Sequence, residues 1–101
     1  MVRTSDDPPK RDKAWAVEFD DRAWRELRKL DAKIQQAILS YLRSRIAVAD
    51  DPRRFGKPPR RNLAGLWRYR MEDYRLICRI EEARVVVLVL KVGHRREVYE
   101  D

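Results

Sequence analysis

Arginines recur at alternate positions within residues 66–79, on both sides of a short turn signal. Arg68 and Arg70 precede the turn, and Arg75 and Arg79 follow it. In an extended chain, residues two apart project from the same face. Because the flat guanidinium fork matches the oxygens of a phosphate group, this pattern predicts a site for phosphates on one face of a sheet.

The turn signal fixes which side chains face each other. If Glu72-Asp73 is a two-residue hairpin turn, Arg70 lies directly opposite Arg75. Like charges at such a position destabilise a strand pair unless an anion lies between them. The alternative is a solvated sheet face, which is the commoner cause of a charge-rich strand. The single sign of the charges and their guanidinium chemistry favour the anion site.

A basic loop precedes the hairpin. Residues 53–62 contain Gly56 and the pair Pro58-Pro59, which predict an irregular loop. The basic side chains that this loop could offer to a nucleic-acid backbone or to an acidic partner are Arg53, Arg54, Lys57, Arg60 and Arg61. Residues 53–75 hold eight basic and two acidic side chains, which is +6 of the net charge of +7. Such an excess favours a polyanionic or acidic partner, with binding that weakens as salt rises.

The segments that position these residues alternate between strand and helix patterns. Residues 14–19 alternate in polarity and predict a first strand, after which Asp20 or Asp21 caps a helix. Apolar residues then recur at helical spacing in two runs separated near Asp31, so we expect two amphipathic helices, the second ending by Asp50. Three further strands joined by short turns are predicted at residues 66–71, 74–80 and 84–92.

Together these segments predict an α+β fold, with an N-terminal strand and two antiparallel helices packed on one face of a mostly antiparallel four-stranded sheet. Residues 85–90 are apolar on both faces, which places them in the middle of the sheet. We expect the two helices to pack on the apolar face of the hairpin. The side chains of this face are Trp67, Tyr69, Met71, Tyr74, Leu76, Cys78 and Ile80. We therefore interpret Trp67 and Tyr69 as core residues rather than as a platform for stacking bases.

Length and composition limit the class of protein. A chain of 101 residues has room for one domain, which we expect at 14–101 behind a flexible tail at 1–13. A lone Cys78 and a lone His94 do not suffice for a disulfide or a structural metal site, so we expect no metal and no cofactor. The sequence also lacks a membrane span and a signal peptide, and a cytoplasmic location is expected.

Two motifs resemble the RelE branch of the RelE/ParE toxin superfamily. They are GLWRYRMEDYRLI at 65–77 and VGHRREVY at 92–99, with a valine-rich strand between them. The resemblance covers about residues 14–100. It implies a RelE-like fold, cleavage of mRNA in the A site of the ribosome, and a cognate antitoxin that wraps and neutralises the toxin.

The resemblance also implies roles for individual residues. Basic residues at Arg68 and Arg70 would hold the RNA, and the matches to catalytic or phosphate-binding positions are Arg75, Arg95 and Tyr99. The best-known members carry lysines at the positions of Arg68 and Arg70. Because arginine is a poor proton shuttle, these two residues are better suited to electrostatic stabilisation than to acid–base catalysis.

RNA is cut without a metal when its 2′-hydroxyl attacks the adjacent phosphate. The reaction needs a proton acceptor, a donor for the leaving 5′-oxygen, and a stabiliser of the charge between them, which the arginines would provide. Tyr99 and His94 are the candidates for proton transfer. The alternatives are that His94 is a turn histidine beside Gly93 and that Tyr99 packs the end of the chain.

Two other functions remain open from the sequence. A ParE-like relative would inhibit DNA gyrase with the same fold and without cutting RNA. A member whose catalytic set has decayed would only bind nucleic acid or antitoxin. The histidine and terminal tyrosine of VGHRREVY favour the ribonuclease.

Overall fold

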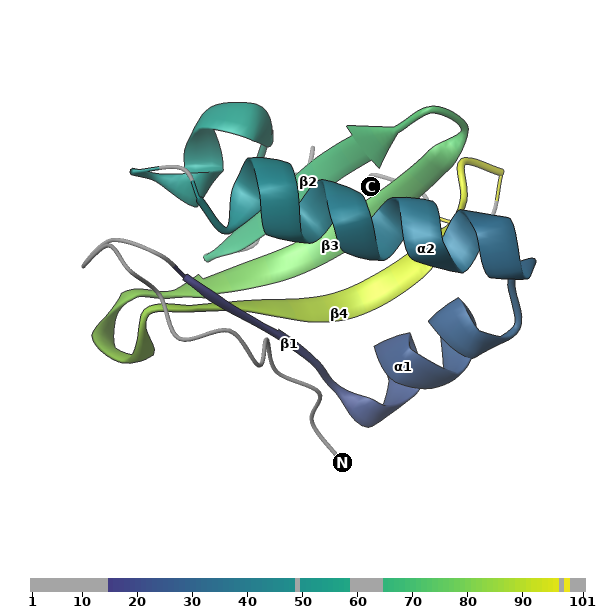
Figure 1. Ribbon diagram of the computed structural model, residues 1–101. Helices are drawn as coiled ribbons and strands as arrows, with labels where there is room; N and C mark the ends of the chain where they lie inside the picture. The colour runs from purple at the N-terminus through teal and green to yellow at the C-terminus, as the bar shows by residue number, and fades with distance from the viewer. Residues whose placement is uncertain (1–14, 49, 59–64, 97, 99–101) are drawn as a thin grey trace.

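The computed structural model describes residues 15–48, 50–58, 65–96 and 98. It forms two layers, a four-stranded sheet and two helices that lie against one of its faces (Figure 1). The strands are β1 (Ala16–Phe19), β2 (Leu66–Met71), β3 (Tyr74–Glu81) and β4 (Val86–His94), and the helices are α1 (Asp21–Arg28) and α2 (Ala32–Tyr41). The predicted α+β fold is confirmed, while the predicted tail at 1–13 lies outside the described residues.

The strand order is β1-β4-β3-β2, with β1 parallel to β4 and the other neighbours antiparallel. The apolar segment 85–90 thus lies mostly in β4, between β1 and β3, as its two apolar faces predict. β4 begins two residues later than predicted, because Glu82–Arg84 form a 3-10 turn and Val85 adopts a left-handed conformation with φ of 56°.

The two helices begin at the aspartates that the sequence indicates. Asp20 Oδ1 accepts a hydrogen bond from the Ala23 amide at 2.8 Å, and an Asp31 carboxylate oxygen accepts one from the Lys33 amide at 3.2 Å. α2 runs directly into a π-helical turn, Leu42–Ile46, which ends the helical segment before Asp50 as predicted.

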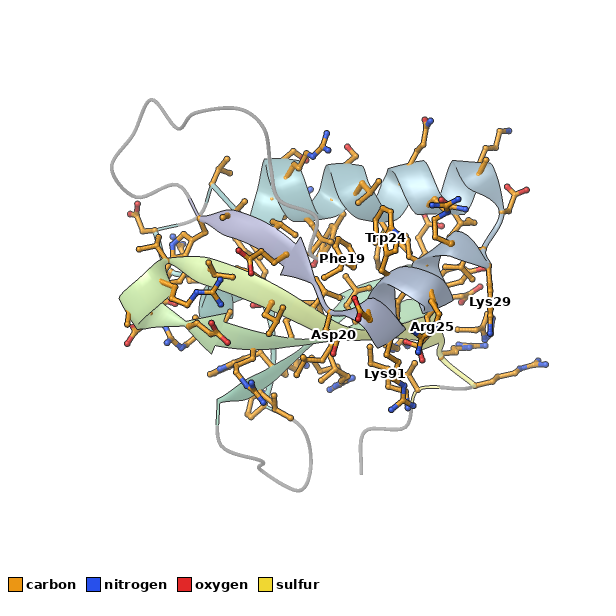
Figure 2. All side chains as sticks on the ribbon, turned by 90° about the horizontal axis from the view of Figure 1, so that it is seen from below. Phe19, Asp20, Trp24, Arg25, Lys29 and Lys91 are labelled. Atoms are coloured by element: carbon orange, nitrogen blue, oxygen red, sulfur yellow. The ribbon has the colours of Figure 1, made fainter. Side chains whose placement is uncertain are left out.

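Helix α1 covers the part of β4 that β1 leaves open. β1 is short, and its pairing with β4 ends at Phe19 opposite Val89. Beyond that point the Val92 amide donates a hydrogen bond to Glu26 Oε1 of α1 at 2.9 Å. Figure 2 shows Phe19 and Trp24 at this junction, where their rings meet edge to face at 5.6 Å. The exposed edge of β4 is thereby blocked by a helix.

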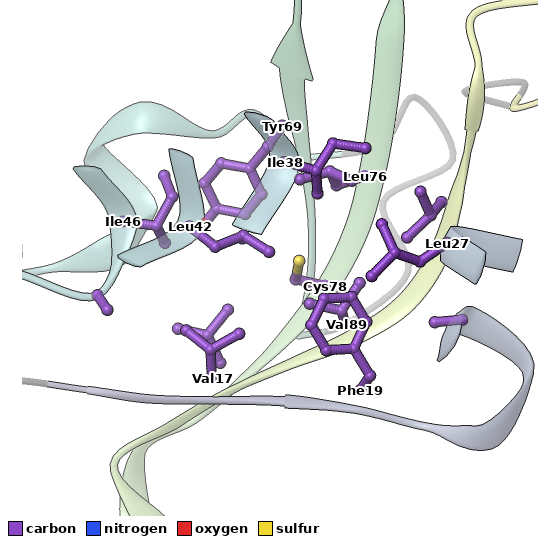
Figure 3. Close-up of a cluster of buried hydrophobic side chains, with 14 of the residues drawn as sticks. Val17, Phe19, Leu27, Ile38, Leu42, Ile46, Tyr69, Leu76, Cys78 and Val89 are labelled. Carbon is purple, nitrogen blue, oxygen red and sulfur yellow. The ribbon is translucent and has the colours of Figure 1, made fainter. Parts of the chain in front are cut away.

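The core lies between the sheet and the helices (Figure 3). Its fully buried side chains come from both layers and include Phe19, Leu27, Ile38, Leu42, Ile46, Tyr69, Leu76, Cys78, Val87 and Val89. Burying one such large apolar side chain contributes about 1.5–3 kcal/mol. Tyr69 also donates a hydrogen bond from its hydroxyl to the Pro52 carbonyl at 2.8 Å, so its polar end is satisfied. Core packing, and not base stacking, is thus the role of Tyr69.

The described part of the basic loop, residues 53–58, is more regular than the sequence predicts. Pro52–Phe55 form a 3-10 turn, and Lys57 pairs with Arg68 through backbone hydrogen bonds of 2.9 and 2.7 Å in the two directions. Gly56 permits this approach, because a Cβ at that position would lie 2.9 Å from the Tyr69 ring. Within the described part of the chain, no helix is long and apolar enough to cross a membrane.

Candidate functional site

The predicted hairpin register is confirmed at every pair. Arg70 lies opposite Arg75, Arg68 opposite Ile77, and Arg79 opposite Leu66. Their neighbours of the other parity, such as Tyr69 and Leu76, are buried under the helices. Arg68, Arg70, Arg75 and Arg79 therefore project from the face of the sheet that the helices leave uncovered, which we call the arginine face.

Arg70 and Arg75 differ in their surroundings. Arg70 is exposed, whereas only 8% of Arg75 is accessible to solvent. Arg75 Nη1 donates hydrogen bonds to the carbonyl oxygens of Glu72 at 3.0 Å and Tyr74 at 3.1 Å, so the turn holds its guanidinium in place. On the other side of Arg75, the partner in β4 is Gly93, which has no side chain. The pair thus consists of one fixed and one accessible guanidinium.

A second row of side chains crosses the sheet beside this pair. The register places Lys57, Arg68, Ile77 and Lys91 in line from the loop through β2 and β3 to β4. Directly paired residues share a face, so both lysines join the arginine face. Lys57 was expected at this site, while Lys91 was not.

The sequence pattern does not predict Lys91 on this face, because a β-bulge changes the side to which Lys91 projects. The register between β3 and β4 shifts between Ile77 and Cys78, so that Lys91 pairs with Ile77 although Val89 pairs with Cys78. Without this shift, Lys91 would share the buried parity of Val87 and Val89. An uninterrupted apolar run in the sequence gives no sign of such a bulge; the only available signal was a lysine at a position whose parity predicts burial.

At the end of β4, Arg95 and His94 lie in different surroundings. The Arg95 amide donates to the Asp73 carbonyl at 2.7 Å, and Arg95 Nε lies 3.9 Å from Asp73 Oδ1, so Arg95 adjoins the β2–β3 turn. His94 pairs with Tyr74, which shares the parity of Leu76 and not that of Arg75. The His94 ring packs edge to face on Tyr74 at 5.6 Å. The structure therefore brings Arg95 near the turn that holds Arg75, and places His94 on the opposite parity.

The far end of the arginine face is neutralised by acidic residues. Glu18, with 8% of its surface exposed, accepts two hydrogen bonds from Arg84 Nη2 at 3.0 and 3.1 Å. Arg84 also binds Glu81 at 2.6 Å, and Arg79 Nη1 lies 3.9 Å from the other oxygen of Glu81. Arg79 thus belongs to the border of the basic surface, whose excess positive charge lies toward β2 and the β2–β3 turn.

Two predicted contributors, Arg53 and Arg54, lie in the 3-10 turn Pro52–Phe55. Arg53 forms ion pairs with Asp51 at 2.8 Å and Glu82 at 3.1 Å, which gives it a structural role in fixing the loop. Arg54 is exposed in the same 3-10 turn. The predicted residues Arg60, Arg61 and Tyr99 lie outside the described residues.

The remaining reactive groups do not form another site. Burial raises the pKa of the Cys78 thiol well above its usual range, which keeps it protonated and unreactive. Across residues 15–48, 50–58, 65–96 and 98, no three histidine, cysteine, aspartate or glutamate side chains are grouped so that they could hold a metal ion. The arginine face is the candidate site, and its chemistry is the binding of anions.

Comparison with known proteins agrees with this geometry. Residues 17–99 match the family model of the ParE toxin of type II toxin–antitoxin systems. Toxin RelG of Mycobacterium tuberculosis is 36% identical over 85 residues, covering 84% of this chain and 95% of that protein. The mRNA interferase toxin RelE of Escherichia coli is 29% identical over 92 residues, covering 87% and 93% respectively.

A solved structure shows the same fold. A chain in the crystal structure of the toxin–antitoxin complex RelBE2 from Mycobacterium tuberculosis matches with a TM-score of 0.74 and 34% identity. The match covers 86% of this chain and 98% of that one. Sequence family, relatives and fold agree, and the chain belongs to the RelE/ParE superfamily of toxins from type II toxin–antitoxin systems.

Proposed function

We propose that this toxin is an endoribonuclease that cuts mRNA in the ribosomal A site by metal-independent attack of the 2′-hydroxyl on the adjacent phosphate. The observation that carries the proposal is the directly opposed pair Arg70 and Arg75 on the sheet face opposite the two helices. Two guanidinium groups placed side by side match the oxygens of an RNA phosphate. The name of the Escherichia coli relative, mRNA interferase toxin RelE, supports an activity on mRNA.

In the proposed reaction, the 2′-oxygen bonds to phosphorus while the bond from phosphorus to the 5′-oxygen breaks. The 2′-hydroxyl loses a proton and the leaving 5′-oxygen gains one. Negative charge grows on the phosphate oxygens between these events, and fixed guanidinium groups stabilise it without having to reorganise. Arg75 suits this role because the turn carbonyls hold it, and Arg68, Arg70 and Arg95 supply further positive charge.

Proton transfer is assigned to Tyr99, with His94 as the second candidate. We rank His94 second because it projects from the face opposite to that of Arg75. Its ring packs on Tyr74, and its Nδ1 accepts a hydrogen bond from the Arg96 amide at 3.2 Å. Nearby arginines would favour the tyrosinate form of Tyr99, and a tyrosinate can act as the base. Lys57, Arg60, Arg61 and Arg79 are proposed as outer contacts to the RNA.

The proposed partners follow from this activity. RelBE2 is a toxin–antitoxin complex, and we infer that a cognate antitoxin neutralises this chain as well. An acidic antitoxin would suit the basic surface. The ribosome and its mRNA would be met in the cytoplasm, and no cofactor takes part in the proposed reaction.

A direct test incubates purified protein with translating ribosomes and maps the mRNA ends. Wild-type protein is expected to produce cuts in the A-site codon, and Tyr99→Phe and Arg75→Ala are expected to abolish them. Cuts that persist in both variants would contradict the assigned roles. Since the matched family model bears the ParE name, gyrase supercoiling is measured in parallel. Inhibition of gyrase without RNA cuts would favour a ParE-like target, and neither effect would favour a non-catalytic binder.

A further inference from the structure

The bulge in β4 turns a lysine onto the arginine face. Val87 and Val89 point into the core, and strict alternation would send Lys91 there as well. The register shift instead pairs Lys91 with Ile77, one step along the face from the pair formed by Gly93 and Arg75. β-Bulges interrupt a ladder and are concentrated near functional sites, where they redirect a side chain.

The bulge is held by a side chain from the other layer. Glu26 Oε1 accepts the hydrogen bond of the Val92 amide at 2.9 Å, immediately after Lys91. The amide would otherwise be an unpaired donor at the edge where β1 has ended. Helix α1 thus fixes the local path of β4 and the direction of Lys91.

Among the described residues, Lys91 differs in its ion pairing from three arginines near the border of this surface. Arg79, Arg84 and Arg95 each lie within 4 Å of an acidic side chain, at distances of 3.9, 2.6 and 3.9 Å. Within the described residues, no acidic side chain forms an ion pair with the Lys91 ammonium. Because an unpaired charge is costly to bury, a half-buried cation of this kind would be stabilised by an external anion.

We propose that Lys91 is an RNA-binding residue, whose ammonium contacts a phosphate next to the one held by Arg70 and Arg75, with Glu26 as its positioning residue. This inference rests on the proposed function of the arginine face. Diagonal neighbours on adjacent strands lie about 7–8 Å apart, so Lys91 and Arg75 can serve successive phosphates of one chain. In Figure 2, Lys91 lies at the same end of the molecule as Arg25 of α1. The RNA would thus cross the strands from β2 toward β4.

The test compares Lys91→Gln, Lys91→Arg and the control Lys33→Gln, whose lysine is exposed on α2. Cleavage is measured on ribosomes programmed with mRNA. Loss of a charge-assisted contact is expected to lower kcat/KM about tenfold in Lys91→Gln, and Lys91→Arg should remain near wild type. The inference is overturned if Lys91→Gln cuts like wild type, or if Lys91→Arg is impaired as much as Lys91→Gln. Wild-type protein that leaves mRNA intact would instead remove the proposed function and this inference together.

A salt titration distinguishes a phosphate contact of Lys91 from a packing role, because only a phosphate contact changes the salt dependence of binding. Binding is measured to ribosomes whose A-site mRNA carries 2′-O-methyl groups, which block the attacking oxygen. Lys91→Gln should make the slope of log affinity against log salt shallower by about 0.7, the value for one contact to single-stranded RNA. Glu26→Ala should reduce cleavage and Glu26→Gln, which keeps an acceptor oxygen, should restore it. An unchanged slope in Lys91→Gln would contradict a phosphate contact.

Discussion

Arg70 and Arg75 lie directly opposite each other in the β2–β3 hairpin, the first exposed and the second almost buried. Like charges at directly opposed positions generally disfavour a strand pair. We therefore expect Arg70, which we propose as an RNA contact, to affect stability and RNA binding in opposite directions. The effects on protein stability and on RNA cleavage can each be measured.

Arg70→Thr should increase stability and weaken RNA binding. Removing one charge relieves the repulsion, and threonine suits a strand, so the free energy of unfolding should rise by about 0.5 kcal/mol. Urea unfolding measures this change, with Arg43→Thr on the helical layer as a control for the loss of one charge. A destabilised Arg70→Thr protein that still cuts mRNA would show that the pair has a structural role.

Val85→Asn should stabilise the turn between β3 and β4. Val85 has φ of 56° and ψ of 51°, a region that is costly for a β-branched residue and that asparagine tolerates. A gain of about 1 kcal/mol in the free energy of unfolding is expected. Ala83→Asn, in the same turn and without a positive φ, should give no gain. Equal effects of the two substitutions would contradict backbone strain at Val85.

Leu27→Ala should destabilise the contact of α1 with the sheet. Leu27 is completely buried, and its truncation is expected to cost about 2–5 kcal/mol. Val48→Ala provides the control, because Val48 is 54% exposed and its truncation should cost less than about 0.5 kcal/mol. Urea unfolding of the two variants distinguishes them, and similar midpoints would mean that α1 does not pack as described.

Cys78 should be unreactive in the folded protein. It is fully buried, and burial raises the pKa of its thiol, so that the thiolate needed for reaction is scarce. An aromatic disulfide reagent should label native protein more than about 100-fold more slowly than unfolded protein. Ser44→Cys, at an exposed position, should react quickly in the same protein. Rapid labelling of Cys78 would place it outside the core.

Much of the hairpin could be predicted because its turn has only two residues. Once Glu72-Asp73 forms the turn, every pair from Met71 and Tyr74 to Leu66 and Arg79 is determined, and polarity then selects the face that the helices cover. The N-terminal aspartate caps of both helices followed from equally local signals.

The parts that escaped prediction depend on contacts between distant segments. The bulge before Lys91 lies where the pairing of β4 with β1 ends and Glu26 contacts β4, and no local pattern in 86–94 predicts this contact. The same shift sets the parity of His94, which the motif alone grouped with the arginines. Lys57 pairs with Arg68 only because Gly56 allows the loop to approach the Tyr69 ring. The sequence therefore predicted which segments are basic better than it predicted the face from which each basic side chain projects.

The most direct measurement maps mRNA ends on translating ribosomes with wild-type protein, Arg70→Ala and the control Arg43→Ala. Arg70 is the accessible member of the opposed pair, and Arg43 is also exposed but lies on the helical layer. Wild type and Arg43→Ala should produce the same A-site cuts, and Arg70→Ala should lower their rate about 100-fold. Equal cutting by Arg70→Ala and Arg43→Ala would contradict a catalytic surface on the uncovered face of the sheet.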